Sequence, residues 1–124
     1  MEIPSIVRAY IEAYNAMDVG RMLECLAEDV RFQNISSGQV DVETAGKERF
    51  AELAEVGVAA FRERRQDVTG CIVVGAHTMV EIAYTATVAA DLPNGWKAGQ
   101  RLAFSGASYF RTANGRIAEI VDQS

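Results

Sequence analysis

Strand-like segments fill the second half of the chain, and they constrain the fold more than any other feature of the sequence. Residues 68–74, 78–90, 102–112 and 116–122 are rich in β-branched, aromatic and alternating residues, which favour strands. The joins between them are short at residues 75–77 and 112–115. The second join contains Asn114-Gly115, a strong hairpin signal because both residues tolerate positive φ. The pattern predicts consecutive antiparallel hairpins.

The first part of the chain has helical periodicity instead. Ser5 can cap a helix after Pro4, and its apolar positions recur at three- and four-residue spacing: Ile6, Tyr10, Ala13, Tyr14 and Met17. Asp18 can cap a second, short helix with Met22, Leu23 and Leu26 on one side, followed by a strand over residues 30–34.

Residues 35–46 contain Ser36, Ser37 and Gly38 without a long apolar run, and we expect a loop or lid there. Residues 47–65 predict a third helix, in which Gly57 allows close packing. Helices followed by antiparallel strands indicate one α+β domain over residues 1–124, with helices covering one face of a curved sheet. The concave face of such a sheet can hold a small ligand.

Composition excludes several classes of protein. With 49% hydrophobic and 23% charged residues, the 124-residue chain is typical of a globular domain. A net charge of -5 and the lack of a basic stripe argue against nucleic acid as a partner. We expect no metal site, because His77 is the only histidine and the two cysteines, Cys25 and Cys71, form no CxxC pair. The start of the chain lacks a secretory signal, and no apolar run is long enough for a membrane helix, so we expect a cytoplasmic protein without a membrane partner.

Four segments carry a family resemblance: YIEAYNAMD, LAEDVRFQN, AGKERF and YFRTANGRIAEIVDQ. In this order they resemble the nuclear transport factor 2-like superfamily, and especially its ketosteroid isomerase and SnoaL-like polyketide cyclase branches. The resemblance implies a cone-shaped, barrel-like α+β fold, in which N-terminal helices pack on a highly curved mixed sheet that encloses a pocket. It implies function less specifically, because this fold hosts enzymes, carriers and assembly domains.

The resemblance to the isomerases is incomplete at the catalytic positions. Tyr10 falls where those enzymes have their oxyanion-binding tyrosine, but Asn34 falls where they have the aspartate that acts as general base. Their second oxyanion donor, a protonated aspartic acid, would fall near Gly106 or Ala107. Because an amide cannot accept a substrate proton, we expect no steroid isomerisation by the isomerase mechanism.

Asp122 on the last strand is the substitute carboxylate. If Ala118 and Ile120 face the cavity, the two-residue period of a strand sends Asp122 the same way. SnoaL-like cyclases are similar in using a late aspartate as acid and base, and a desolvated carboxylate would have a raised pKa. The competing interpretation is a solvated, inert residue two positions from the chain end. We predict Asp122, Tyr10 and Asn34 as the catalytic set, with Tyr10 and Asn34 donating hydrogen bonds to an enolate oxygen.

Apolar and aromatic residues that face inward by pattern form the predicted ligand pocket. They are Tyr14, Met17, Phe32, Phe61, Ile82, Tyr84, Phe104, Phe110 and Ile120, although such residues are equally typical of a plain core. Trp96 can cap the pocket mouth or contact a second subunit. Arg49, Arg101 and Arg111 have no acidic partner visible in the sequence, so the Asp-Arg-Asp triad of the limonene epoxide hydrolase branch cannot be assigned.

The leading functional hypothesis is a cofactor-free SnoaL-like enzyme of the isomerase, cyclase or dehydratase type, acting on a small hydrophobic carbonyl compound. Two alternatives stay open: a non-catalytic protein that binds a hydrophobic ligand, and a dimerisation module. A homodimer fits all three, and the small outward side chains of Ala103, Ser105 and Ala107, with Tyr109, offer a surface for it.

Overall fold

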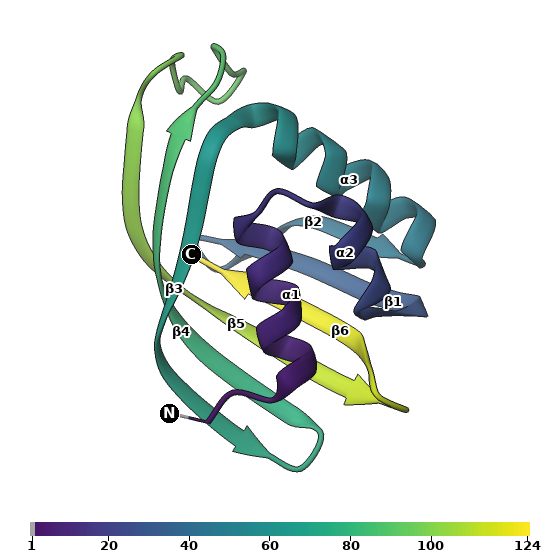
Figure 1. Ribbon diagram of the computed structural model, residues 1–124. Helices are drawn as coiled ribbons and strands as arrows, with labels where there is room; N and C mark the ends of the chain where they lie inside the picture. Colours follow the sequence, from purple (N-terminus) through teal and green to yellow (C-terminus); the bar gives the residue numbers. More distant parts are fainter. Residues whose placement is uncertain (1) are drawn as a thin grey trace.

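The computed structural model describes residues 2–124, which form three helices and six strands (Figure 1). The helices are α1 (Ser5–Asn15), α2 (Val19–Glu24) and α3 (Lys47–Ala60). The strands are β1 (Leu26–Ser36), β2 (Gln39–Ala45), β3 (Phe61–Val74), β4 (His77–Val88), β5 (Arg101–Ala113) and β6 (Arg116–Gln123).

The six strands form one open, mixed sheet in the order β2-β1-β6-β5-β4-β3. Strands β1 and β6 are parallel, and every other neighbouring pair is antiparallel. The long strands β3, β4 and β5 bend, and the helices lie on the concave side of the sheet (Figure 1). The predicted α+β cone-like fold is therefore confirmed, with the sheet left open between β2 and β3.

Helix α1 crosses the concave face and buries Val7, Tyr10, Ile11 and Ala13 against the sheet. Its N-cap is Pro4, and no side chain caps it, so the predicted cap at Ser5 is wrong: Ser5 is already helical. Asp18 does cap α2, because its Oδ1 accepts a hydrogen bond from the backbone of Arg21. Leu26, expected in this helix, begins β1 instead.

The predicted loop or lid over residues 35–46 is wrong, because β2 occupies most of it. Val40, Val42 and Thr44 give this segment the alternation of a strand, and it pairs with β1 from Arg31 to Ser36. Strand β2 is an edge strand, so its mostly exposed polar residues conceal the pattern.

The predicted helix over residues 47–65 is correct only as far as Ala60. From Phe61 the chain extends and pairs with β4, where Arg64 lies opposite Ala86. This long-range pairing overrides the local helical preference of the arginine-rich stretch. As a result, Arg64 lies on a strand and its side chain faces the interior.

The predicted hairpins are confirmed. Strands β3 and β4 join through Gly75 and Ala76, with Gly75 at φ 59°. Strands β5 and β6 join through Asn114 and Gly115 at φ 53° and 76°, as a two-residue hairpin with the matching twist requires.

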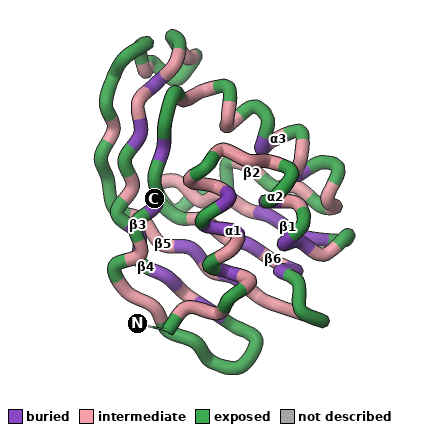
Figure 2. Tube along the Cα trace, in the orientation of Figure 1, coloured by how far each residue is buried: buried purple, intermediate pink, exposed green. Residues whose placement is uncertain are grey.

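Buried side chains concentrate between α1, α2 and α3 and the middle of the sheet (Figure 2). Phe110, Ile117 and Ile120 are at most 1% exposed and form the floor of this core. Burying each such side chain stabilises the fold by about 1.5–3 kcal/mol. Within residues 2–124, no helix has the length and apolar character to cross a membrane.

Candidate functional site

Two neighbouring cavities open between the helices and the sheet. The outer cavity, about 620 Å³, lies beside the C-terminus and the connection over residues 89–100, and the inner cavity, about 280 Å³, lies beneath α3. The residues that line both are Tyr14, Asn34, Phe61 and Asp122. The two cavities therefore adjoin at these four side chains.

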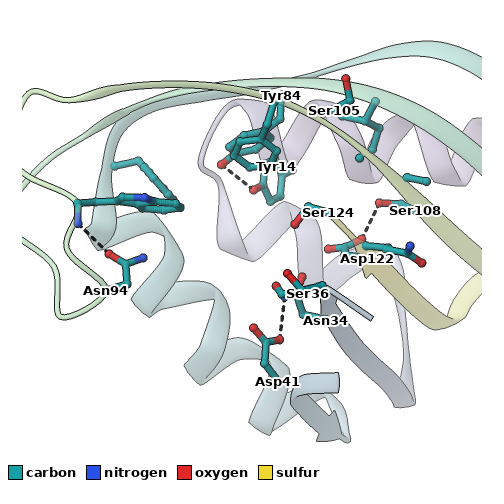
Figure 3. Close-up of a pocket in the computed structure, with 18 residues that line it drawn as sticks. Tyr14, Asn34, Ser36, Asp41, Tyr84, Asn94, Ser105, Ser108, Asp122 and Ser124 are labelled. Carbon is teal, nitrogen blue, oxygen red and sulfur yellow. Dashed lines mark hydrogen bonds between the residues drawn. The ribbon is translucent and has the colours of Figure 1, made fainter. Parts of the chain in front are cut away.

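Asp122 lies on β6 and lines both cavities, and Figure 3 shows its side chain in the outer one. Its Oδ1 accepts a 2.6 Å hydrogen bond from Oγ of Ser108, the residue opposite it on β5. Burial raises the pKa of the Asp122 carboxyl to about 6, and the Ser108 hydrogen bond opposes that rise. Asp122 is half-buried and hydrogen-bonded, unlike the solvated terminal residue of the competing interpretation.

Asn34 lies opposite Asp122 on the parallel neighbour β1. Its Nδ2 donates hydrogen bonds to Oγ of Ser36 at 3.2 Å and to Oδ1 of Asp41 at 2.8 Å. Both amide hydrogens are thus engaged, and the group left to a ligand is the Asn34 carbonyl oxygen, an acceptor. The predicted role as a donor to an enolate would require one of these hydrogen bonds to be exchanged.

Tyr10 lines the inner cavity together with Asp122. The ring is 4% exposed and packs edge-on against Phe110, with ring centroids 5.8 Å apart. Burial, followed by the negative charge of Asp122, raises the pKa of the Tyr10 phenol well above its usual value. The phenol therefore stays protonated and can donate a hydrogen bond, the role predicted for it.

Tyr14 and Tyr84 face each other in the outer cavity, where the hydroxyl of Tyr14 donates to that of Tyr84 at 3.1 Å (Figure 3). Burial is also the main cause of a raised pKa at Tyr84. Because its oxygen accepts from Tyr14, the hydroxyl hydrogen of Tyr84 is available to a ligand.

The other predicted ligand-binding residues divide into two groups. Phe32 lines the inner cavity, Phe61 lines both, and Ile82 and Phe104 line the outer one. The remaining three lie outside both linings: Met17, Phe110 and Ile120. Met17 misses the site because α1 ends at Asn15, while Phe110 and Ile120 belong to the closed core beneath it.

The register of β5 against β6 also shows that Ala118 does not face the cavity, contrary to the expectation from the sequence. Ile117 and Ile120 both lie in the core cluster, three residues apart, because the β5–β6 pairing shifts between Arg111 and Thr112. Ala118 consequently lines a separate groove with Arg111 and Arg116. Asp122 reaches the cavity because alternation resumes after this shift.

Trp96 lines the outer cavity and lies 6.3 Å from the Phe61 ring, as expected of a residue at the pocket mouth. His77 begins β4, and its Nδ1 is hydrogen-bonded to the Tyr109 hydroxyl at 2.6 Å on the exposed surface. The arginines considered for a triad pair with glutamates, none of which lines either cavity: Arg49 with Glu52, Arg101 with Glu63 and Arg111 with Glu119.

Sequence reasoning missed two functional candidates, Ser108 and Arg64. Ser108 is 3% exposed, and only the β5–β6 register shows that it faces Asp122. Arg64, 6% exposed, lines the inner cavity, and its guanidinium carbon lies 3.6 Å from the centre of the Tyr14 ring. The signal that could have identified it is the strand alternation of Arg64 with Gln66 and Val68, hidden by the expected helix.

Comparison with known proteins is consistent with this architecture. The sequence profile of the SnoaL-like domain matches residues 7–120, nearly the whole chain. This chain belongs to the SnoaL-like family. No curated protein sequence matches it.

Solved structures resemble this SnoaL-like protein over most of their length. A candidate polyketide cyclase from Pseudomonas putida is 27% identical, with a TM-score of 0.76 over 98% of this chain and 90% of that one. A protein with a ketosteroid isomerase-like fold from Catenulispora acidiphila, in complex with trimethylamine, has a TM-score of 0.80 at 19% identity, over 98% and 85%. An LEH-like epoxide hydrolase from Mycobacterium tuberculosis has a TM-score of 0.74 at 19% identity, over 95% of this chain and 78% of that one.

Gly106 is one of the two positions, with Ala107, at which the resemblance to the isomerases would place their second oxyanion donor. A Cβ atom at Gly106 would lie 2.7 Å from the backbone oxygen of Gln123, so an aspartate cannot replace this glycine without moving the last strand. The carboxyl group of the site comes from β6 itself.

Proposed function

We propose that this protein is a cofactor-free enzyme that moves a proton next to the carbonyl group of a small, largely apolar compound, in an isomerisation, cyclisation or dehydration. The observation that carries the proposal is the half-buried Asp122 carboxyl at the junction of the two cavities. Its pKa of about 6 leaves it mainly ionised at neutral pH yet basic enough to take a proton. Membership of the SnoaL-like family supports a small-molecule enzyme.

In this mechanism Asp122 removes a proton from the carbon beside the carbonyl and later returns it to the rearranged product. Ser108 holds the carboxyl in place through Oδ1, which leaves Oδ2 free to face the substrate. The carbonyl oxygen gains negative charge as the enolate forms. A neutral tyrosine hydroxyl that points at this oxygen stabilises the charge.

Tyr10 is the proposed donor to the enolate oxygen, because it shares the inner cavity with Asp122 and forms no hydrogen bond with another described residue. Tyr84 is the equivalent group on the outer side. Both amide hydrogens of Asn34 are engaged, so this residue presents its side-chain carbonyl oxygen to the ligand as an acceptor next to Asp122.

Hydrogen–deuterium exchange tests this proposal without knowledge of the final product. Small apolar ketones such as 2-tetralone and 1-indanone would be incubated with the protein in D₂O, and exchange at the α-carbon would be followed by NMR. We expect catalysed exchange that is lost in Asp122→Asn and retained in Asp29→Asn, which neutralises an exposed carboxylate on β1. An exchange rate that is unchanged in Asp122→Asn would refute the role of Asp122 as the base.

A non-catalytic ligand-binding protein is the alternative that this experiment separates. The apolar residues along both cavities would serve it equally well. In that case the ketones bind, Asp122→Asn leaves their affinity unchanged, and no exchange occurs on long incubation.

The proposal includes a cytoplasmic homodimer that assembles through the outer side of β5. Ala103 and Ser105 are exposed there, in agreement with a surface of small residues. Light scattering after size exclusion should give twice the mass of one chain, and Ala103→Glu should lower it. A monomer at every concentration would contradict the dimer without affecting the proposed chemistry.

A further inference from the structure

The buried guanidinium of Arg64 is the strongest feature that the proposed proton transfer does not use. Arg64 is 6% exposed, and within residues 2–124 no carboxylate lies within 4.0 Å of it. Its neighbours in the sequence, Arg62 and Arg65, are exposed. Arginine is rarely this buried without an anionic partner, since removing an ion from water costs several kcal/mol.

The contacts of Arg64 show where its guanidinium points. Its Nε donates to the backbone oxygen of Tyr14 at 3.1 Å, and Nη2 lies 3.8 Å from the Met22 sulfur. A Cβ atom on Gly57 would lie 3.3 Å from Nη1. Met22 and Gly57 both line the inner cavity, as does Arg64, so the two terminal nitrogens lie at the wall of that cavity.

Few contacts within the protein replace the hydration that the buried Arg64 guanidinium has lost. A guanidinium has five N–H donors, and here one of them meets a strong acceptor while another approaches a thioether, a weak one. The Tyr14 ring adds a cation–π contact. Gly57 lies against Nη1 and has no side chain that could accept a hydrogen bond from it.

Asp122 does not act as the missing counter-ion. It lines the same cavity, but no ion pair within 4.0 Å joins it to Arg64. In the sheet, β6 is separated from β3 by β5 and β4. The two residues are also offset along the strands, because Arg64 lies level with Leu102 of β5 whereas Asp122 pairs with Ser108, six residues away. The inner cavity thus has an acidic and a basic wall.

We propose that Arg64 binds the carboxylate of the substrate, which is therefore an oxo acid: an apolar body with a carbonyl group at the Asp122 wall and a carboxylate at the Arg64 wall. The position of the carbonyl group at Asp122 rests on the proposed function, whereas the binding of the carboxylate by Arg64 does not. A bidentate pair between guanidinium and carboxylate in a desolvated site fixes both orientation and register of the ligand. The largely apolar lining between the two walls suits the body of such a compound.

Binding of a matched pair of probes tests this inference without turnover. 5-Phenylpentanoate and 5-phenylpentanamide differ at one end, where the first carries a carboxylate and the second a neutral amide of similar size. Isothermal titration calorimetry at pH 7.5 should give a Kd for the acid at least tenfold below that for the amide in the wild-type protein. Arg64→Met should abolish this preference by weakening the acid alone, and Arg64→Lys should keep part of it.

Arg62→Met is the matched control, because Arg62 is exposed on the same strand and its loss changes the net charge equally. It should leave the preference intact. Equal affinities of the wild-type protein for acid and amide would overturn the proposal even if Arg64→Met failed to fold. A preference that survives in folded Arg64→Met would also overturn it.

The Asp122→Asn variant separates this inference from the proposed function. Asp122→Asn should lose α-carbon exchange yet retain the preference for the acid, because Arg64 is unchanged. In the wild-type protein, α-carbon exchange without a preference for the acid would refute the anion site alone, and a preference for the acid without exchange would refute the proton transfer alone.

Discussion

Ser108 and Asp122 lie opposite each other on β5 and β6, and a 2.6 Å hydrogen bond joins the serine hydroxyl to the carboxyl oxygen. The pair lies in the sheet, where backbone hydrogen bonds on both sides hold β6 between β5 and β1. A carboxyl group two residues from the end of the chain is thereby fixed in position. Its acidity depends on two opposing influences, burial and the serine.

Replacing Ser108 by alanine should raise the pKa of Asp122 above about 6, because the hydrogen bond favours the ionised form. A general base works when ionised, so the acidic limb of the pH–rate profile for α-carbon exchange should move to higher pH. At pH 6 the rate should fall several-fold, and at pH 9 it should approach that of the wild type. A uniform loss at all pH values would instead indicate misplacement of the carboxyl.

Asp122 should also make the folded protein less stable at neutral pH than at mildly acidic pH. Its folded pKa of about 6 exceeds the unfolded value of 3.8, so the folded state holds the proton more tightly. The destabilisation is absent below pH 3.8 and grows as the pH rises to about 6. It amounts to about 1–3 kcal/mol, given 1.36 kcal/mol per pKa unit and the partial exposure of the residue.

Asp122→Asn should therefore melt several degrees higher than the wild type at pH 7.5, with the difference shrinking at pH 4. Thermal unfolding followed by circular dichroism measures this directly. Asp29→Asn, at an exposed position, should show no such pH-dependent gain. If Asp122→Asn were less stable than the wild type at pH 7.5, the carboxyl would be serving as a structural acceptor.

Replacing Tyr10 by phenylalanine should reduce the exchange rate by roughly 10²-fold, as loss of one oxyanion donor does elsewhere. The free energy of unfolding should change little, because the Tyr10 hydroxyl has no hydrogen-bond partner among residues 2–124 while its ring keeps the contacts with Phe50 and Phe110. Tyr109→Phe, which removes a surface hydroxyl, is the control for the chemistry. An unchanged rate in Tyr10→Phe would transfer the donor role to Tyr84.

Local signals in the sequence were sufficient to predict an α+β domain with helices on a curved sheet, and the family resemblance supplied the cone-like fold. The Asn114-Gly115 turn and the Asp18 cap each depend on a few adjacent residues, and both form as expected. The Ser5 cap is a local prediction that was wrong, and the two larger failures concern segments whose structure depends on distant partners. Strand β2 forms on an edge against β1, and residues 61–65 extend only because β4 pairs with them.

The site was predictable only in part for the same reason. Tyr14 and Asp122 follow from periodicity within one element, whereas Phe61 was expected on a helix and begins β3 instead. Ser108 depends on the register between two strands, and Arg64 on where α3 ends. A one-residue shift in β5 against β6 also turned Ala118 away from the cavity, which alternation counted along a single strand cannot show.

Replacing Gly106 by alanine should destabilise the protein by about 1–3 kcal/mol, because the new Cβ would lie 2.7 Å from the backbone oxygen of Gln123. The end of β6 must then move, and it carries Asp122 with it, so α-carbon exchange should fall as well. Gly70→Ala is the matched control: it lies on β3, and its Cβ would meet Glu81 at an ordinary 3.4 Å. Chemical denaturation and the exchange assay measure the two effects, and equal stability of both variants would show that β6 tolerates displacement at its end.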